Sequence, residues 1–260
     1  MNKNLLIEKI ENAKYLSFGD IFSESIELFK KVWLQGFIKI LLEGVLGILL
    51  IILFQVPILL IIGSFAFTTS YMGESAAPVM ALPMLVLIFG LMLLAIVGAG
   101  VFTMALSAGF YRICKIKDFN EVGSDDYFYY LKRKYFRKMA LLVMASIGIS
   151  IVAMLLCFFP VYFVMIPIAF FTLIFTFNPE LSASDIISVG FKIGTKKWGI
   201  TFALMIVSGF LASLVGGILC VVGVFFTASF SYLPIYFVYK HVIGFDDDYR
   251  VDSMEMKTIE

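Results

Sequence analysis

The chain has 260 residues, of which 61% are hydrophobic and only 15% are charged. This composition excludes a protein with a single soluble core, because a chain of this length cannot hide so many apolar residues from water. The 20 Lys and Arg residues nearly balance the 19 Asp and Glu residues. Attraction to anionic lipid headgroups is therefore expected of individual segments and not of the whole chain.

Six apolar runs predict six transmembrane helices. A helix of about 20 apolar residues crosses the hydrocarbon core of a bilayer and satisfies its own backbone hydrogen bonds there. Short turns join the third span to the fourth and the fifth to the sixth, and residues 68–78 are expected to form the loop between the first two. The predicted fold class is an all-α polytopic membrane helix bundle, with spans at residues 37–62, 79–108, 140–158, 161–177, 200–218 and 221–239.

The basic residues predict how the chain is oriented. Apart from Lys39, near the start of the first span, all Lys and Arg residues fall in segments on one side of this six-span plan. An excess of Lys and Arg marks the cytoplasmic side, so both termini are expected in the cytoplasm. Residues 1–15 are polar and mixed in charge, without the apolar run of a signal peptide, and are interpreted as mature protein.

Two copies of an entry sequence precede the first and the fifth span. A shift of 165 positions aligns residues 16–21 (Leu-Ser-x-x-Asp-Ile) with residues 181–186, and it also aligns Trp33 with Trp198, the two tryptophans of the chain. Ser-x-x-Asp predicts a helix start, because the Ser side chain accepts from a first-turn amide and the acid reaches back to the cap. We expect each copy to be a cytoplasmic amphipathic helix, with its Trp as an interfacial anchor at headgroup depth.

The repeat interpretation extends to a third, looser copy. Its helix is expected to begin at Ser124. In the second copy, Gly190 and Gly194 are expected to let a neighbouring helix approach closely. An even number of spans separates the copies, so the repeats are parallel and not inverted. Residues 1–260 then form a single integral membrane domain, with repeat units at about 16–110, 124–178 and 181–243 and a cytoplasmic tail at 244–260.

This architecture, together with the entry motifs that end in Lys31-x-Trp33 and Lys196-x-Trp198, resembles a family of poorly characterised bacterial six-span membrane proteins. The family includes the membrane domain attached to some glycerophosphodiester phosphodiesterases, and the resemblance covers about residues 16–244. The catalytic domain of those enzymes is absent here, since nothing in the chain supplies its acidic metal site and histidines. The resemblance therefore implies a helical fold and a bacterial cytoplasmic membrane location, and no activity.

The residue types that usually carry chemistry do not form a convincing site. His241 is the only histidine, whereas an iron or zinc enzyme normally needs several nitrogen ligands. Residues 190–196 lack the spacing of a phosphate loop. The acids at 246–248 and 252 lack the Gly and terminal Glu of a calcium-binding loop and are interpreted as a solvated tail. We expect no enzyme activity, no metal and no cofactor.

Cys157 and Cys220 are predicted near extracytoplasmic turns, where oxidation is chemically accessible. We interpret them as small apolar residues at helix ends, with a disulfide between them as the alternative.

Lys39 and Glu43 are the only ionisable pair within the predicted spans. They are four residues apart and therefore share one face of a helix. A charge at depth is costly and usually functional, whereas at the start of a span both groups can lie at headgroup level. We prefer the interfacial placement and keep a functional role as the alternative.

Small residues at four-residue spacing predict close helix packing. Such faces let helices approach in lipid, within a compact bundle or equally in a homo-oligomer. They are Ala95 with Ala99, Ala105 with Gly109, and Ser208 with Ala212 and Gly216.

Two classes of function fit these observations. The preferred hypothesis is a non-enzymatic integral membrane protein whose basic interfacial helices bind membrane lipids, in a lipid-interacting or scaffolding role. The alternative is a small transporter or channel with Glu43 facing an internal cavity. The basic segment 132–138 is interleaved with Tyr and Phe beside a span, which suits lipid headgroups better than nucleic acid. The identity of any protein partner is left open by the sequence.

Overall fold

The computed structural model describes residues 1–72, 77–156, 159–218 and 222–245 of the chain. Within these ranges all regular secondary structure is helical, which confirms the all-α prediction. The helices are α1 (Lys3–Glu11), α2 (Phe18–Met72), α3 (Ala77–Asp118), α4 (Arg133–Leu155), α5 (Phe159–Phe177), α6 (Ala183–Lys196), α7 (Trp198–Ile218), α8 (Val222–Thr227), the 3-10 helix η2 (Ala228–Tyr232) and α9 (Leu233–Val242).

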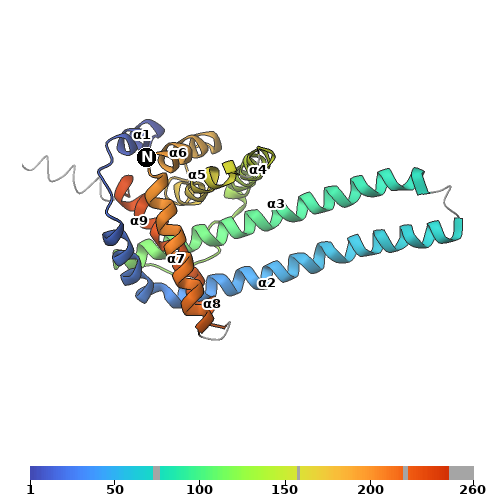
Figure 1. Ribbon diagram of the computed structural model, residues 1–260, viewed down its shortest axis with the longest axis horizontal. Coiled ribbons are helices and arrows are strands. Elements are labelled where there is room, and N and C mark those ends of the chain that lie inside the picture. Colours follow the sequence, from blue (N-terminus) through green and yellow to red (C-terminus); the bar gives the residue numbers. More distant parts are fainter. Residues whose placement is uncertain (73–76, 157–158, 219–221, 246–260) are drawn as a thin grey trace, which may run out of the picture.

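Helices α2 and α3 form a hairpin that projects far beyond the other elements (Figure 1). They contain 55 and 42 residues, so the expected entry helix and first span are one uninterrupted helix. No proline lies between Phe18 and Phe37, and an isolated glycine such as Gly19 or Gly36 costs about 1 kcal/mol without ending a helix. The predicted loop at 68–78 is also shorter than expected, because α2 continues to Met72 and α3 begins at Ala77.

The remaining elements pack around the base of this hairpin and form a compact body (Figure 1). The centre of the body is the second half of α3, where every residue from 104 to 111 is buried. Buried side chains of α5, α6 and α9 join α3 in one hydrophobic core, including Phe170, Ile186, Tyr236 and Tyr239.

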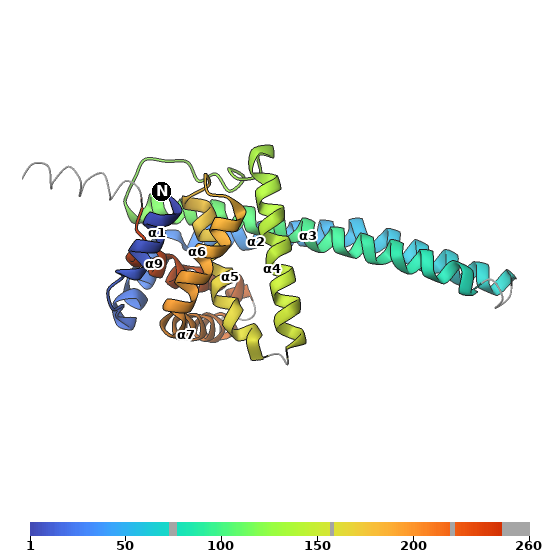
Figure 2. The ribbon, with the colours of Figure 1, turned by 90° about the horizontal axis from the view of Figure 1, so that it is seen from above.

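Five helices in the described ranges are long and apolar enough to cross a membrane, and by this criterion the chain is an integral membrane protein. These helices, α2, α3, α4, α5 and α7, do not run parallel to one another. In Figure 1 α7 is seen along its length and α4 nearly end-on, whereas Figure 2 shows the reverse, and the α2–α3 hairpin lies across both views. The body is therefore not an up-and-down bundle of parallel helices.

The sixth predicted span, residues 221–239, is not one continuous helix. Among its described residues the chain forms α8, then η2, then α9, and each is too short to cross a membrane. Pro234 stands in the first turn of α9. Since proline lacks an N–H and clashes with the carbonyl four residues earlier, a continuous α-helix would be broken at Phe230, where the 3-10 turn is found.

The helix predicted to begin at Ser124 does not form, and α4 begins only at Arg133. The Asp126 carboxylate accepts from the Phe128 N–H at 3.0 Å, which closes a local turn in place of a helix cap. The Tyr127 hydroxyl donates to the Gln35 carbonyl at 3.0 Å and ties the segment to α2. A Cβ atom at Gly109 would come within 2.5 Å of the Tyr127 carbonyl oxygen, so α3 packs directly on this backbone.

Helix α6 has the predicted cap and the predicted close contact. The Ser182 hydroxyl oxygen accepts from the Asp185 N–H at 3.1 Å, as the Ser-x-x-Asp motif requires. A Cβ atom at Gly194 would come within 2.6 Å of the Pro167 Cα, and one at Gly190 within 2.5 Å of the Phe171 ring. Helix α6 therefore packs on α5 at backbone distance, which only glycine permits here.

The predicted small-residue faces differ in what they pack against. Ser208, Ala212 and Gly216 of α7 are buried, and the Thr227 hydroxyl donates to the Ala212 carbonyl at 2.7 Å, which confirms close packing there. Ala95 and Ala99 instead line a hollow between α2 and α3.

Candidate functional site

Lys39 and Glu43 form an ion pair at the base of the hairpin, on the face of α2 that meets the body. The Lys39 Nζ lies 3.0 Å from the Glu43 Oε1. The Lys39 side chain is fully buried, and 18% of the Glu43 side chain is exposed. The contact is an ion pair without hydrogen-bond geometry, since neither atom has a hydrogen-bond partner among the described residues. Lys39 is thus enclosed by protein and does not lie on the outer face of α2.

An aromatic ring completes the surroundings of the ammonium group. The Lys39 Nζ lies 3.5 Å from the centroid of the Tyr232 ring, an attraction of about 2 kcal/mol when water is excluded. Tyr232 belongs to η2, which packs on the α2 backbone: a Cβ atom at Gly36 would come within 2.1 Å of the Ser229 hydroxyl oxygen. The absence of a side chain at Gly36 therefore lets η2 come close enough to place Tyr232 over Lys39.

A cavity of about 430 Å³ lies beside this pair, and we call it the chamber. Its polar lining is formed by hydroxyl groups, and its apolar lining includes Ile40 and Met205. The hydroxyl groups come from α3, α5 and η2, and belong to Ser107, Tyr111, Thr172, Ser231 and Tyr232.

The hydroxyl groups of the chamber differ in their partners. That of Ser107 lies close to the Glu43 carboxylate. Those of Tyr111, Thr172, Ser231 and Tyr232 make no hydrogen bond with another described residue. None of these oxygen atoms is both fully buried and without a partner, so those that lack a protein partner are accessible in the chamber and can hydrogen-bond a polar ligand. Lys39 and Glu43 neutralise each other, so the chamber offers hydrogen bonds and little net charge.

Most residues of the chamber could not be found from the sequence. The pairing of Lys39 with Glu43 follows from their spacing alone. Ser107 and Tyr111 are also four residues apart, which was a usable signal for a shared face of α3. Ser231 and Tyr232 gave no signal, because the prediction placed them within a continuous sixth span.

The two predicted anchor tryptophans have different surroundings. Trp33 lies within α2 and is 44% exposed, and its one ring neighbour among the described residues is Phe226, at 6.0 Å. Trp198 begins α7 and is stacked between Phe163 and Phe202, with ring centroids 4.9 and 4.7 Å away. Their alignment as copies of one repeat stays a prediction.

The remaining candidates do not join the chamber. The His241 Nε2 lies 3.0 Å from the Glu24 carboxylate on the surface of the body. In the described ranges no three His, Cys, Asp or Glu residues are grouped as metal ligands would be. Cys157, Cys220 and the acidic residues 246–252 lie outside the described residues.

A second cluster, which we call the basic aromatic surface, lies at residues 128–137. Arg112 and Lys132 both lie over the ring of Tyr129, with Cζ and Nζ at 4.3 and 4.5 Å from its centroid. Phe128 and Phe136 are 48% and 56% exposed, which is unusual for such large apolar side chains in water. The exposed bases of this surface are Lys132, Arg133, Lys134 and Arg137.

No protein-family model, curated protein or solved structure matches the chain. The resemblance to the six-span bacterial family therefore stays a prediction.

Proposed function

We propose that the chain is a non-enzymatic integral membrane protein of a bacterial cytoplasmic membrane that binds anionic lipid headgroups at its cytoplasmic face, in a lipid-interacting or scaffolding role. The observation that carries the proposal is the basic aromatic surface. Exposed bases attract phosphate groups, and exposed Phe side chains beside them enter the boundary between headgroups and acyl chains. Four exposed bases and two exposed aromatic rings lie within ten residues of sequence at the start of α4.

The test removes two bases and measures lipid retention. Each Lys or Arg near an anionic leaflet contributes about 1 kcal/mol, so Lys134→Gln combined with Arg137→Gln should weaken the preference for anionic lipid roughly 30-fold. Native mass spectrometry of protein released from nanodiscs would compare retained phosphatidylglycerol with retained phosphatidylcholine.

The matched control is Lys30→Gln combined with Lys31→Gln, which changes the net charge equally on the exposed face of α2. Because Glu24 and Glu27 balance these lysines on the same face, a smaller change is expected. Equal losses in both double variants would show that only net charge matters and would contradict a specific surface.

A small transporter or channel is the second candidate, and the position of Glu43 favours it. Glu43 is the less enclosed member of a buried ion pair beside a cavity of about 430 Å³. A carboxylate so placed can exchange its lysine partner for a proton or a cation. Transport by this route would stop in Glu43→Gln, whereas headgroup binding at residues 128–137 would continue.

A further inference from the structure

One face of the hairpin carries two more hollows in line with the chamber. In α2, Ile40, Gly47, Phe54, Ile61 and Thr68 recur every seven residues and so lie along one side of the helix. Ile40 lines the chamber, Gly47 and Phe54 line a middle hollow of about 390 Å³, and Ile61 and Thr68 line a distal hollow of about 440 Å³. The three spaces therefore lie along one side of α2 with α3 opposite, and α5, α7, η2 and α9 also line the chamber. We call this side of the hairpin the groove.

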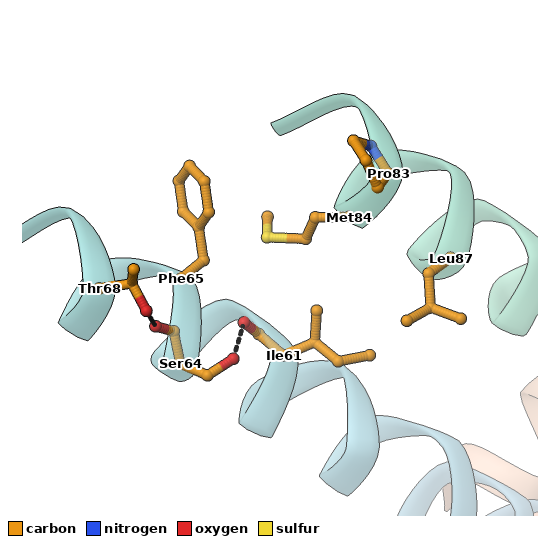
Figure 3. A pocket seen from close by; sticks show the side chains of 7 residues that line it. All are labelled: Ile61, Ser64, Phe65, Thr68, Pro83, Met84 and Leu87. Atoms are coloured by element: carbon orange, nitrogen blue, oxygen red, sulfur yellow. Dashed lines mark hydrogen bonds between the residues drawn. The ribbon is translucent and has the colours of Figure 1, made fainter. Parts of the chain in front are cut away.

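Away from the chamber the groove is mostly apolar, and Gln55 is the one described residue with a polar side chain that lines the middle hollow. In the distal hollow Phe65 and Met84 extend towards each other from the two helices (Figure 3). The hydroxyl groups of Ser64 and Thr68 donate to carbonyls of their own helix, each at 2.8 Å, so they offer little to a guest. In the middle hollow Ala95 and Ala99 provide the space, because their side chains are too short to fill the gap.

The polar end of the groove is at Glu43. Glu43 lies about one turn from Ile40 of the chamber and one turn from Gly47 of the middle hollow. From Glu43 to Ile58, the far end of the middle hollow, fifteen residues of helix span about 22 Å. An amphipathic ligand with a polar head and a long apolar tail fits this arrangement, which is polar near Glu43 and mostly apolar along the middle hollow.

We infer that the groove binds an uncharged glycerolipid of the diacylglycerol class, with its hydroxyl and ester groups in the chamber and one acyl chain in the middle hollow. The head is uncharged because Lys39 is fully buried and already paired with Glu43, so a phosphate group cannot reach it. The hydroxyl groups of Thr172, Ser231 and the two tyrosines match the hydroxyl and ester oxygens of a glycerol backbone. This site is separate from the basic aromatic surface and goes beyond headgroup binding there.

The experiment is photocrosslinking of the full chain in phosphatidylcholine nanodiscs that contain a diazirine-bearing diacylglycerol. A parallel sample contains the matched diazirine-bearing phosphatidylglycerol. We expect the diacylglycerol to label the segments 47–58 and 92–99 more strongly than the phosphatidylglycerol does. Equal labelling by the two probes would overturn the assignment of an uncharged head.

Two sets of variants locate the acyl chain and the head. Ala99→Phe fills the middle hollow and should abolish labelling there, whereas Ala66→Phe, an exposed alanine of the same hairpin that does not line the groove, should not. Thr172→Val combined with Ser231→Ala removes two chamber hydroxyl groups while preserving shape. It should reduce diacylglycerol labelling about two- to tenfold, as the loss of a hydrogen bond does.

Unchanged labelling in the Thr172 and Ser231 double variant would overturn the site in the chamber even if Ala99→Phe fails to fold. If the proposed headgroup binding at the basic aromatic surface is wrong, Lys134→Gln combined with Arg137→Gln will leave the retention of anionic lipid unchanged. These two substitutions lie outside the groove, so the two proposals can fail separately.

Discussion

A buried ammonium group is tolerated only while its charge has a partner, and at Lys39 that partner is Glu43. The two residues are not equivalent. Lys39 is fully enclosed, whereas 18% of the Glu43 side chain is exposed. Removing one member of a buried ion pair costs about 3–5 kcal/mol, because the other charge is left unpaired, while replacing both by uncharged groups costs far less. The penalty should therefore depend on which charge remains.

We expect Glu43→Gln to lower the free energy of unfolding by about 3 kcal/mol or more, because it leaves the enclosed Lys39 ammonium with only the Tyr232 ring. Lys39→Met should cost less, since the remaining carboxylate is partly exposed. The double variant should be more stable than Glu43→Gln alone. Equilibrium unfolding in mixed micelles measures all three.

The control for this series is Lys30→Met, an exposed lysine of the same helix, which should change stability by no more than about 0.5 kcal/mol. Additive costs of the two single changes would show that the residues do not interact, and would contradict the pairing.

At the scale of elements, helix α1 is held to the body by charged contacts around two apolar side chains. Leu6 and Ile10 are fully buried. Lys3 pairs with Asp185 at 3.0 Å, and Lys192 pairs with Glu11 at 2.8 Å, so both ends of α1 are tied to α6. At the end of α1 the Lys196 ammonium donates to the Glu11 carbonyl, and the Lys197 ammonium donates to the Lys14 carbonyl at 2.7 Å. The contact with Glu11 satisfies a carbonyl that the helix end leaves free, whereas Lys14 lies beyond the end of α1.

The docking of α1 should weaken at acidic pH. The hydrogen bond from Lys192 holds the pKa of Glu11 below its ordinary value of 4.5, and hydrogen bonds from Ser182 and Lys3 hold the pKa of Asp185 below 3.8. A carboxylate with a lowered pKa stabilises the fold above its ordinary pKa, and this contribution is lost as pH falls through the lowered value. Amide hydrogen exchange in α1, corrected for the intrinsic rate, should stay constant from neutral pH down to 4.5 and rise below it.

In Glu11→Gln this acid-induced rise should be smaller, whereas Glu8→Gln, at an exposed residue of the same helix, should keep the wild-type profile. A profile that is unchanged in Glu11→Gln would assign the effect to other groups.

Elements that depend on local sequence were predictable, and those that depend on distant contacts were not. The apolar runs located α4, α5 and α7 to within a few residues, except that α4 starts seven residues before its predicted span. The Ser182 cap and the glycines of α6 were also predicted from their residue types. The break at η2 was missed because Pro234 was assigned to the interior of a span, and with it Tyr232, whose contact with Lys39 joins opposite ends of the chain. Helix α1 was missed because its apolar face has only a few residues and is buried by α6.

At the scale of the whole molecule, the part of the α2–α3 hairpin that projects from the body contains no Lys or Arg. No Lys or Arg occurs between Lys39, which contacts Tyr232, and Arg112, which contacts Tyr129, and both contacts are with residues of the body. Bases resist transfer across a membrane, so the hairpin tip is expected on the side opposite the basic aromatic surface.

Cysteine labelling would test this arrangement. In a background with Cys114, Cys157 and Cys220 replaced by alanine, Ser70→Cys near the hairpin tip should react with a membrane-impermeant maleimide in right-side-out vesicles. Lys134→Cys should react only in inside-out vesicles. Reaction of both positions from the same side would contradict the predicted orientation.

The ion pair at the base of the hairpin also bears on how the protein is made. A ribosome delivers the chain from its N-terminus, so the hairpin reaches the membrane well before the segment that carries Tyr232 has been synthesised. During that interval Lys39 cannot rely on the completed body. Glu43 lies one helical turn further along the same helix and is available almost as soon as Lys39 itself, at a separation of 3.0 Å in the finished fold. Neutralisation within one helix would let the newborn hairpin enter lipid early, and Tyr232 would then close over a pair that had already formed.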